Sequence, residues 1–243
     1  MNARLMAVRH HFGKPFRSPA SQGEALTGAA RQAQGIVGNQ REGFGFTRFG
    51  IAADRQFGPL GLTLGTEWLR EERTMLGAYL HDGLAPRGAD SVFVDGTASL
   101  DMGDGWQLGG EGRFGSTRAF AGDRIAGGSR FSSAAYSLDV SKRGIWQGED
   151  RLGLRVSSPL RVTSGGLSFD LPVSYDYESE SAVYELRHVS LTPDGREIMG
   201  EVSWFGDAFD GTLAASLFYR SEPGHLRRAP DDRGLLVRWS RGF

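Results

Sequence analysis

The chain has 243 residues, no cysteine and a net charge of −1 at pH 7. These values exclude a disulfide framework, thiol catalysis and a Cys-based zinc site, and they argue against nucleic-acid binding by bulk electrostatic attraction. Glycine accounts for 36 residues without a collagen period, which is typical of a β protein with many turns and bulges. The length suits one large β domain, and no apolar run is long enough for a transmembrane helix.

Residues 1–40 differ in composition from the rest, and we expect a linker or a short helix there. Residues 1–20 are basic and lack a continuous apolar core, so they do not form a secretory signal peptide. We therefore expect the chain to be a fragment of a longer protein, or to have an internal start. Residues 21–34 are rich in alanine and favour either a linker or a small helix that lies inside a pore.

From residue 41 onward the side chains alternate between apolar and polar, which predicts β-strands. The clearest case is segment 91–102, where Val92 and Val94 lie on one face while Asp95 and Asp101 lie on the other. Several segments are as long as the roughly 9–11 residues that a membrane-spanning strand needs. The pattern predicts twelve strands: 44–53, 60–69, 74–80, 91–102, 106–118, 131–142, 151–162, 167–177, 184–191, 197–206, 212–220 and 235–243.

The connections between these strands are unequal. The long connections 81–90, 119–130 and 221–234 all follow odd-numbered strands, whereas the short ones 103–105 and 207–211 follow even-numbered strands. Long loops on one side and short turns on the other are typical of outer-membrane barrels, which also have an even strand number. The sequence therefore predicts a twelve-stranded antiparallel transmembrane β-barrel over residues 41–243.

Charged residues within the predicted strands lie opposite the apolar face. In a soluble barrel they would point outward, and in a membrane barrel they would point into a watery lumen. We interpret them as lining a lumen, and the residues concerned are Asp95, Glu111, Arg113, Arg155, Arg161 and Arg238.

The last strand ends on an aromatic residue. Leu235, Val237, Trp239 and Phe243 share one face, with Arg241 as its polar interruption. A terminal strand of this kind resembles the last strand of bacterial outer-membrane barrels, whose final aromatic is part of the assembly signal. We predict that these four apolar residues carry membrane insertion and lipid contact. The alternative is the final strand of a soluble sheet.

Motifs that carry chemistry are absent from the sequence. We find no zinc-protease helix, phosphate loop or nucleophile elbow, and we predict no metal and no cofactor. His188 and Ser190 share a strand face, which leaves open a hydrolase site on the barrel wall.

Motifs in the second half of the chain resemble one family of bacterial membrane proteins. These motifs are 137–142, 158–162, 171–177, 191–197, 223–225 and 229–232. They resemble the C-terminal translocator barrel of alphaproteobacterial autotransporters whose passenger is a subtilisin-like serine protease. The resemblance covers residues 40–243 and implies a twelve-stranded barrel with a helix in its lumen.

The resemblance also implies a function and a location. A barrel of this family lies in the bacterial outer membrane, where it anchors and helps export an N-terminal passenger; its partners are outer-membrane lipid, the barrel assembly machinery and that passenger. The protease motifs of the family are missing here, so we do not expect an enzyme. The alternatives are a fragment of such a protease, a small porin-like barrel and a soluble β-sandwich.

Overall fold

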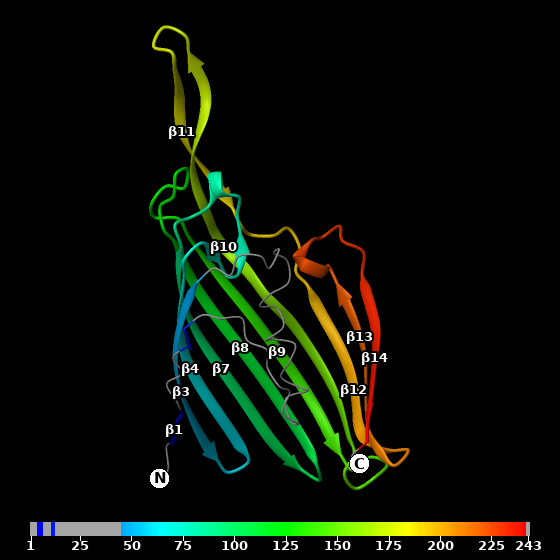
Figure 1. The fold of residues 1–243 in the computed structure, drawn as a ribbon. Coiled ribbons are helices and arrows are strands. Elements are labelled where there is room, and N and C mark those ends of the chain that lie inside the picture. Colours follow the sequence, from blue (N-terminus) through cyan, green and yellow to red (C-terminus); the bar gives the residue numbers. More distant parts are fainter. Residues whose placement is uncertain (1–3, 7–10, 13–44, 242–243) are drawn as a thin grey trace.

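The computed structural model of the chain describes residues 4–6, 11–12 and 45–241. This part is all-β, as the alternation predicts, and its long strands form one antiparallel sheet (Figure 1). The predicted helix over 21–34 lies outside the described residues. The long strands are β3 (Phe46–Phe57), β4 (Leu60–Glu71), β7 (Ala89–Gly103), β8 (Trp106–Ala119), β9 (Arg130–Arg143), β10 (Arg151–Asp176), β11 (Ser181–Ser190), β12 (Ile198–Ala208), β13 (Gly211–Ser221) and β14 (Asp232–Ser240).

Two predicted features are wrong, and the described part has ten long strands rather than twelve. The strand expected at 74–80 is a small hairpin of β5 (Thr74–Met75) and β6 (Ala78–Tyr79), because Leu76 and Gly77 take positive φ angles and reverse the chain. The turn expected at 163–166 does not exist. β10 runs straight through it and absorbs Gly165, at φ 87°, beside a register irregularity.

The connections alternate between the two ends of the sheet. The turn end holds the short connections 58–59, 104–105 and 209–210 together with 144–150. The loop end holds 72–88, 120–129, 191–197 and 222–231. The predicted difference in loop length between the two ends of the sheet is therefore confirmed. The sequence predicts one strand too many before β7 and another within β10. The predicted numbers of the strands from β11 onward are therefore too high by two, and each remains odd or even as predicted.

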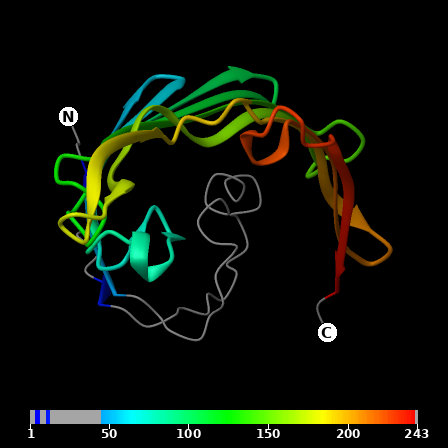
Figure 2. The ribbon, with the colours of Figure 1, turned by 90° about the horizontal axis from the view of Figure 1, so that it is seen from above.

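The sheet is curved, and seen from above it forms an open arc (Figure 2). β3 and β14 stand near its two ends. The short strands β1 (Arg4–Met6) and β2 (His11–Phe12) pair with the outer edge of β3. In the described part of the chain no strand pairing joins β14 to this edge, so the arc is not closed.

Loop 72–88 shows which side chains point to the inside of the arc. The loop lies on the concave side (cyan in Figure 2), and its Leu76 and Gly77 backbone N–H groups donate to the carboxylate of Glu71 at 2.6 and 2.8 Å. Residues directly opposite one another in an antiparallel sheet share a face. Following the register from β4 through the sheet places on this concave face Glu67, Asp95, Glu111, Arg113, Asp139, Arg151, Arg155, Glu201 and Arg238.

The convex face has the opposite character. Its central residues are apolar and exposed, among them Ile51, Leu62, Leu64, Val92, Val94, Phe114, Leu138, Leu154, Val156, Val202, Leu217, Leu235 and Val237. Within the described strands, the charged residues of this face stand near the strand ends, with one exception. Arg161 pairs with Ala134 and so lies by register at the level of Val94 and Phe114. The others are Arg70, Asp90, Arg118, Arg130 and Arg233 at the loop end, and Arg55 and Lys142 at the turn end. We call the apolar zone between the two charged ends the convex belt; the Arg161 guanidinium within its span is bonded to loop 191–197.

Buried apolar residues gather at the loop end of the sheet. They are Met75, Ala89, Ala119, Ile125, Phe131 and Leu167, which join loops 72–88 and 120–129 to β9 and β10. This small core packs the two loops against the loop end of the sheet. The centre of the concave face holds the buried Phe93 together with charged and hydroxyl side chains, including the buried Ser137, Ser141 and Arg155.

Candidate functional site

The centre of the concave face is a network of ion pairs that crosses several strands. On β8, Arg113 places one guanidinium nitrogen 3.0 Å from Glu67 on β4 and the other 3.0 Å from Asp95 on β7. Glu67 also binds Arg48 on β3. Because opposite charges meet on this face, its carboxylates and guanidinium groups are compensated at partly buried positions.

A second part of the network continues toward the middle of the sheet. Arg155 on β10 lies 3.6 Å from Glu111 on β8 and donates to the Ser137 hydroxyl at 2.9 Å. Below it, Arg151 donates to Gln107 and to Ser141 at 3.0 and 2.8 Å. A row of polar contacts thus crosses the concave face from β3 to β10, and its side chains are held by bonds to neighbouring strands.

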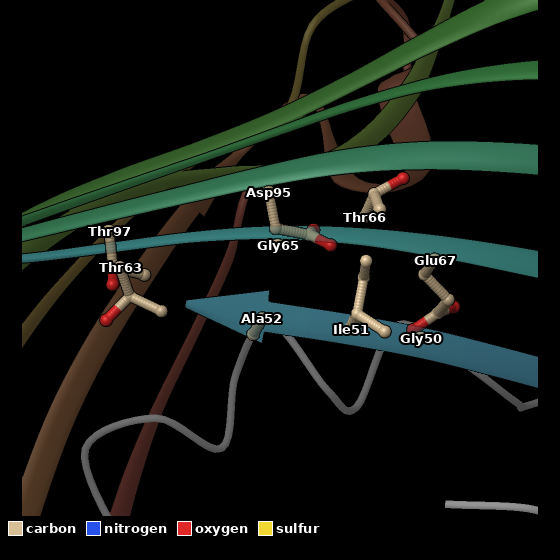
Figure 3. A pocket seen from close by; sticks show the side chains of 9 residues that line it. All are labelled: Gly50, Ile51, Ala52, Thr63, Gly65, Thr66, Glu67, Asp95 and Thr97. Carbon is tan, nitrogen blue, oxygen red and sulfur yellow. The ribbon is translucent and has the colours of Figure 1, made fainter. Parts of the chain in front are cut away.

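A shallow hollow opens beside the first part of the network (Figure 3). Small residues leave this space: Gly50, Ala52 and Gly65 lie where larger side chains would fill it. The Glu67 and Asp95 carboxylates stand at its rim, and the hollow measures about 220 Å³. It can hold water or a short polar group.

The structure places most of the residues expected in a lumen on one face. Asp95 and Arg113 form an ion pair at 3.0 Å, and Glu111 and Arg155 form a longer one at 3.6 Å. Arg238 on β14 shares the face through its register, although no bond joins it to the other four.

Arg161 is placed differently. The register of β10 shifts between Ser158 and Arg161, and the side chain leaves the concave row. It donates to the backbone carbonyls of Pro193 and Gly195 at 2.9 Å each. Arg161 therefore fastens loop 191–197 to β10, and its alternation in the sequence did not reveal this because the bulge breaks the period of two.

Loops 191–197 and 222–231 are joined by a cluster that we call the loop lock, made of Arg161, Glu197, Arg220, Glu222 and His225. Within it the buried Glu197 accepts from the Arg220 guanidinium and from the Gly224 N–H, both at 2.7 Å. Glu222 accepts from the Arg196 N–H at 2.6 Å. Residues of three motifs that carry the family resemblance, 158–162, 191–197 and 223–225, meet in this cluster.

Both ring nitrogens of His225 have a backbone partner. Nδ1 accepts from the Glu197 N–H at 2.9 Å, so the neutral ring carries its proton on Nε2 and donates to the Leu160 carbonyl at 3.1 Å. Burial lowers the pKa of His225, and the Arg161 and Arg196 charges act in the same direction. Burial alone would raise the pKa of Glu197, but the bonds from Arg220 and Gly224 outweigh it and lower that pKa.

A second anchor lies at the turn end. The buried Asp150 carboxylate accepts from the N–H groups of Ile145 and Trp146 and from the indole of Trp204, at 2.8, 3.1 and 3.1 Å. Burial alone would raise the pKa of Asp150, but these hydrogen bonds lower it. The β9–β10 turn is thereby fixed against β12.

The residues expected to carry membrane insertion lie on the convex face. Leu235, Val237 and Trp239 stand opposite Leu217, Ala215 and Leu213 of β13, and they are 70%, 57% and 49% exposed. β14 ends at Ser240, so Arg241 lies beyond the strand and outside the convex belt. Phe243 lies outside the described residues.

The proposed hydrolase pair is not bonded. His188 has its Nδ1 3.3 Å from the Ser168 hydroxyl, while the Ser190 hydroxyl accepts from the Thr192 N–H at 3.2 Å. Among the described residues no group of three metal-binding side chains occurs. No helix in the same residues is long and apolar enough to cross a membrane.

Sequence reasoning missed Glu67, Asp150, Glu197 and His225 as key residues. The alternation of Gly61, Thr63, Gly65 and Glu67 on β4 carries a signal for Glu67, since it continues the charged face. The other three act through contacts between distant segments, which alternation does not reveal.

Comparisons of the chain with protein-family models, curated proteins and solved structures found no match.

Proposed function

We propose that this chain is an outer-membrane β-barrel of the autotransporter type, which anchors an N-terminal passenger and helps export it. The observation that carries the proposal is the inverted polarity of the sheet. The convex belt is apolar and exposed, and the one charged side chain of the described strands within its span, Arg161, is bonded to loop 191–197, while the ion pairs lie on the concave face. A soluble barrel would have the reverse arrangement, since its apolar side chains would fill the inside.

The dimensions and the aromatic residues support the same proposal. Apart from β10, which has 26 residues and continues into the hairpin with β11, the long strands have 9 to 15 residues, comparable with the roughly 9–11 needed to cross a bilayer at a tilt. Exposed or half-buried aromatics border the convex belt, as interfacial girdles do. They are Phe49, Trp68 and Tyr219 near the loop end, and Phe57, Trp106 and Trp239 near the turn end.

The proposal requires both edges of the arc to find partner strands in the membrane, because unpaired N–H and C=O groups are not tolerated in lipid. The free edge of β14 and the edge carrying β1 and β2 are the two that must be joined. A closed barrel of twelve strands is the form that the family resemblance implies.

Transport would use the polarity of the concave face rather than chemistry. An extended passenger exposes many backbone polar groups, and the hydroxyl and charged side chains of this face can exchange hydrogen bonds with it. The proposed partners are therefore outer-membrane lipid, the assembly machinery and the passenger, and the proposed role is not enzymatic.

The test fuses an epitope and a secretory signal peptide before residue 1 and expresses the full chain in a Gram-negative bacterium. We expect the chain in the outer-membrane fraction, with a heat-modifiable electrophoretic mobility, and the epitope exposed on intact cells. A soluble chain would contradict the barrel. Membrane insertion with ion conductance but a hidden epitope would favour the porin-like alternative over export.

A further inference from the structure

The hairpin of β10 and β11 rises beyond the loop end of the sheet (Figure 1). Above Gly166, β10 pairs with β11, and β11 has no other partner strand in the described part of the chain. β11 is therefore an edge strand over all ten of its residues. Such an edge presents unpaired N–H and C=O groups that can pair with another strand.

The side chains of β11 do not protect this edge. Val183, Tyr184, Leu186 and Val189 are 44%, 40%, 64% and 44% exposed, and the strand contains no proline. Its two charged residues, Glu185 and Arg187, lie on one face and bind each other at 2.6 Å. The strand combines exposed apolar residues with one charge of each sign, which restricts the strands that it can accept.

We propose that β11 pairs with β11 of a second copy of this chain, antiparallel and centred on Leu186. When two identical strands pair in an antiparallel sheet, the twofold axis that relates them is perpendicular to the sheet. Because directly opposite residues share a face, this axis passes midway between the two copies of one residue. Centring on Glu185 or Arg187 would place like charges together. Centring on Leu186 places Glu185 opposite the partner's Arg187, and the reverse, so two ion pairs form.

The same register matches the remaining side chains. Val183 stands opposite the partner's Val189, and Tyr184 stands opposite the partner's His188. Cross-strand pairs of opposite charge and of apolar residues stabilise a sheet. Centring on Tyr184 would instead oppose Glu185 to Val183 and Arg187 to Ser181, which leaves both charges without an opposite charge across the strand pair.

This pairing has a geometric consequence that rests on the proposed membrane function. β11 runs along the length of the molecule, so the twofold axis places the second sheet at the far end of the paired hairpins (Figure 1). Two barrels joined in this way lie in facing membranes rather than side by side in one membrane. The hairpin would then be a contact between two membrane surfaces.

The test uses the absence of cysteine from the full chain. In the proposed register the two Leu186 Cα atoms are about 4.5–5.5 Å apart, within the range for a disulfide. We expect Leu186→Cys protein, folded in detergent, to form a disulfide dimer on mild oxidation. Val183→Cys is the matched control, because the two copies of position 183 are about 20 Å apart, yet a mixture of Val183→Cys and Val189→Cys should cross-link.

A charge exchange tests the register independently. Glu185→Arg or Arg187→Glu alone should weaken the dimer about tenfold in sedimentation measurements, and the double variant should restore it. A monomer at all concentrations, cross-linking at every position, or no rescue by the double variant would overturn the proposal. Clustering of vesicles that carry the inserted chain tests the facing-membrane geometry, while heat-modifiable mobility reports separately whether insertion itself has failed.

Discussion

Arg113 on β8 reaches past β7 to Glu67 on β4, with 3.0 Å between a guanidinium nitrogen and a carboxylate oxygen. Alternate strands of a sheet are roughly 10 Å apart, so only side chains that converge on a concave surface make such a contact easily. The same guanidinium holds Asp95. This bridge links three neighbouring strands on the concave face and pairs two of its carboxylates.

Removing this bridge should destabilise the protein. Arg113→Gln leaves Asp95 without its guanidinium partner and Glu67 with Arg48 alone. We expect a loss of about 1.5–3 kcal/mol in the free energy of unfolding, the usual range for hydrogen bonds to charged groups. Chemical denaturation followed by tryptophan fluorescence measures it, and Arg228→Gln, at an exposed loop arginine, should change stability by less than about 0.5 kcal/mol.

The loop lock should weaken on acidification. The pKa of His225 is lowered below its ordinary value of 6.5, so the unfolded chain takes up a proton at a higher pH than the folded chain. The contribution of neutral His225 to the stability of the folded chain is therefore complete above pH 6.5. It is lost as the pH falls through the lower pKa that His225 has in the folded chain. Glu197 behaves likewise from its ordinary value of 4.5 downward, since its pKa is also lowered.

A non-titrating variant separates the histidine from the rest. His225→Asn keeps one donor and one acceptor but cannot gain a proton. Denaturation at a pH of about 7.5 and of about 5.5 should show a smaller loss of stability for this variant than for the natural chain. Equal losses in both proteins would show that His225 does not contribute to the pH dependence.

The turn at residues 144–150 should loosen when its anchor is removed. Asp150→Ala deletes the acceptor of two backbone N–H groups and of the Trp204 indole. We expect faster proteolytic cleavage within this turn and a changed emission from Trp204. Glu149→Ala, at the neighbouring exposed carboxylate, should leave the cleavage rate unchanged.

A charge placed on the convex belt should be costly in a bilayer. Leu138 is 59% exposed at the middle of β9, and Leu138→Arg should lower the stability of the vesicle-inserted protein by about 2–4 kcal/mol. Thr97→Arg is the matched control, because Thr97 points to the concave face opposite Glu111. It should cost much less, and an equal cost for both would argue against lipid on the convex side.

The sequence predicts most of this fold because alternation is a local property. Segment 91–102 is found at Ala89–Gly103, and 131–142 at Arg130–Arg143, within two residues at each end. Alternation fails where a local signal is overridden. The Gly165–Gly166 pair suggests a turn, yet a Cβ at Gly166 would stand 2.0 Å from the Val189 carbonyl, so the glycine allows β11 to approach a continuous strand.

The concave site is predicted only in part for the same reason. The alternation places Asp95, Glu111, Arg113 and Arg155 on one face, and the structure brings them into two bonded groups. The loop lock depends on contacts between residues such as Leu160 and His225, which are 65 positions apart. No period in a single sequence reports such a pairing, and the bulge before Arg161 also removes the period itself.

Labelling of single cysteines along β9 tests most directly whether the convex face meets lipid and the concave face meets water. The chain supplies no cysteine of its own, so Tyr136→Cys and Leu138→Cys report the convex face, and the partly buried positions of Ala135→Cys and Asp139→Cys report the concave face. In vesicles, a water-soluble maleimide should label positions 135 and 139 but not 136 and 138, and all four should react after denaturation. Rapid labelling of positions 136 and 138 in the folded, vesicle-bound protein would contradict it.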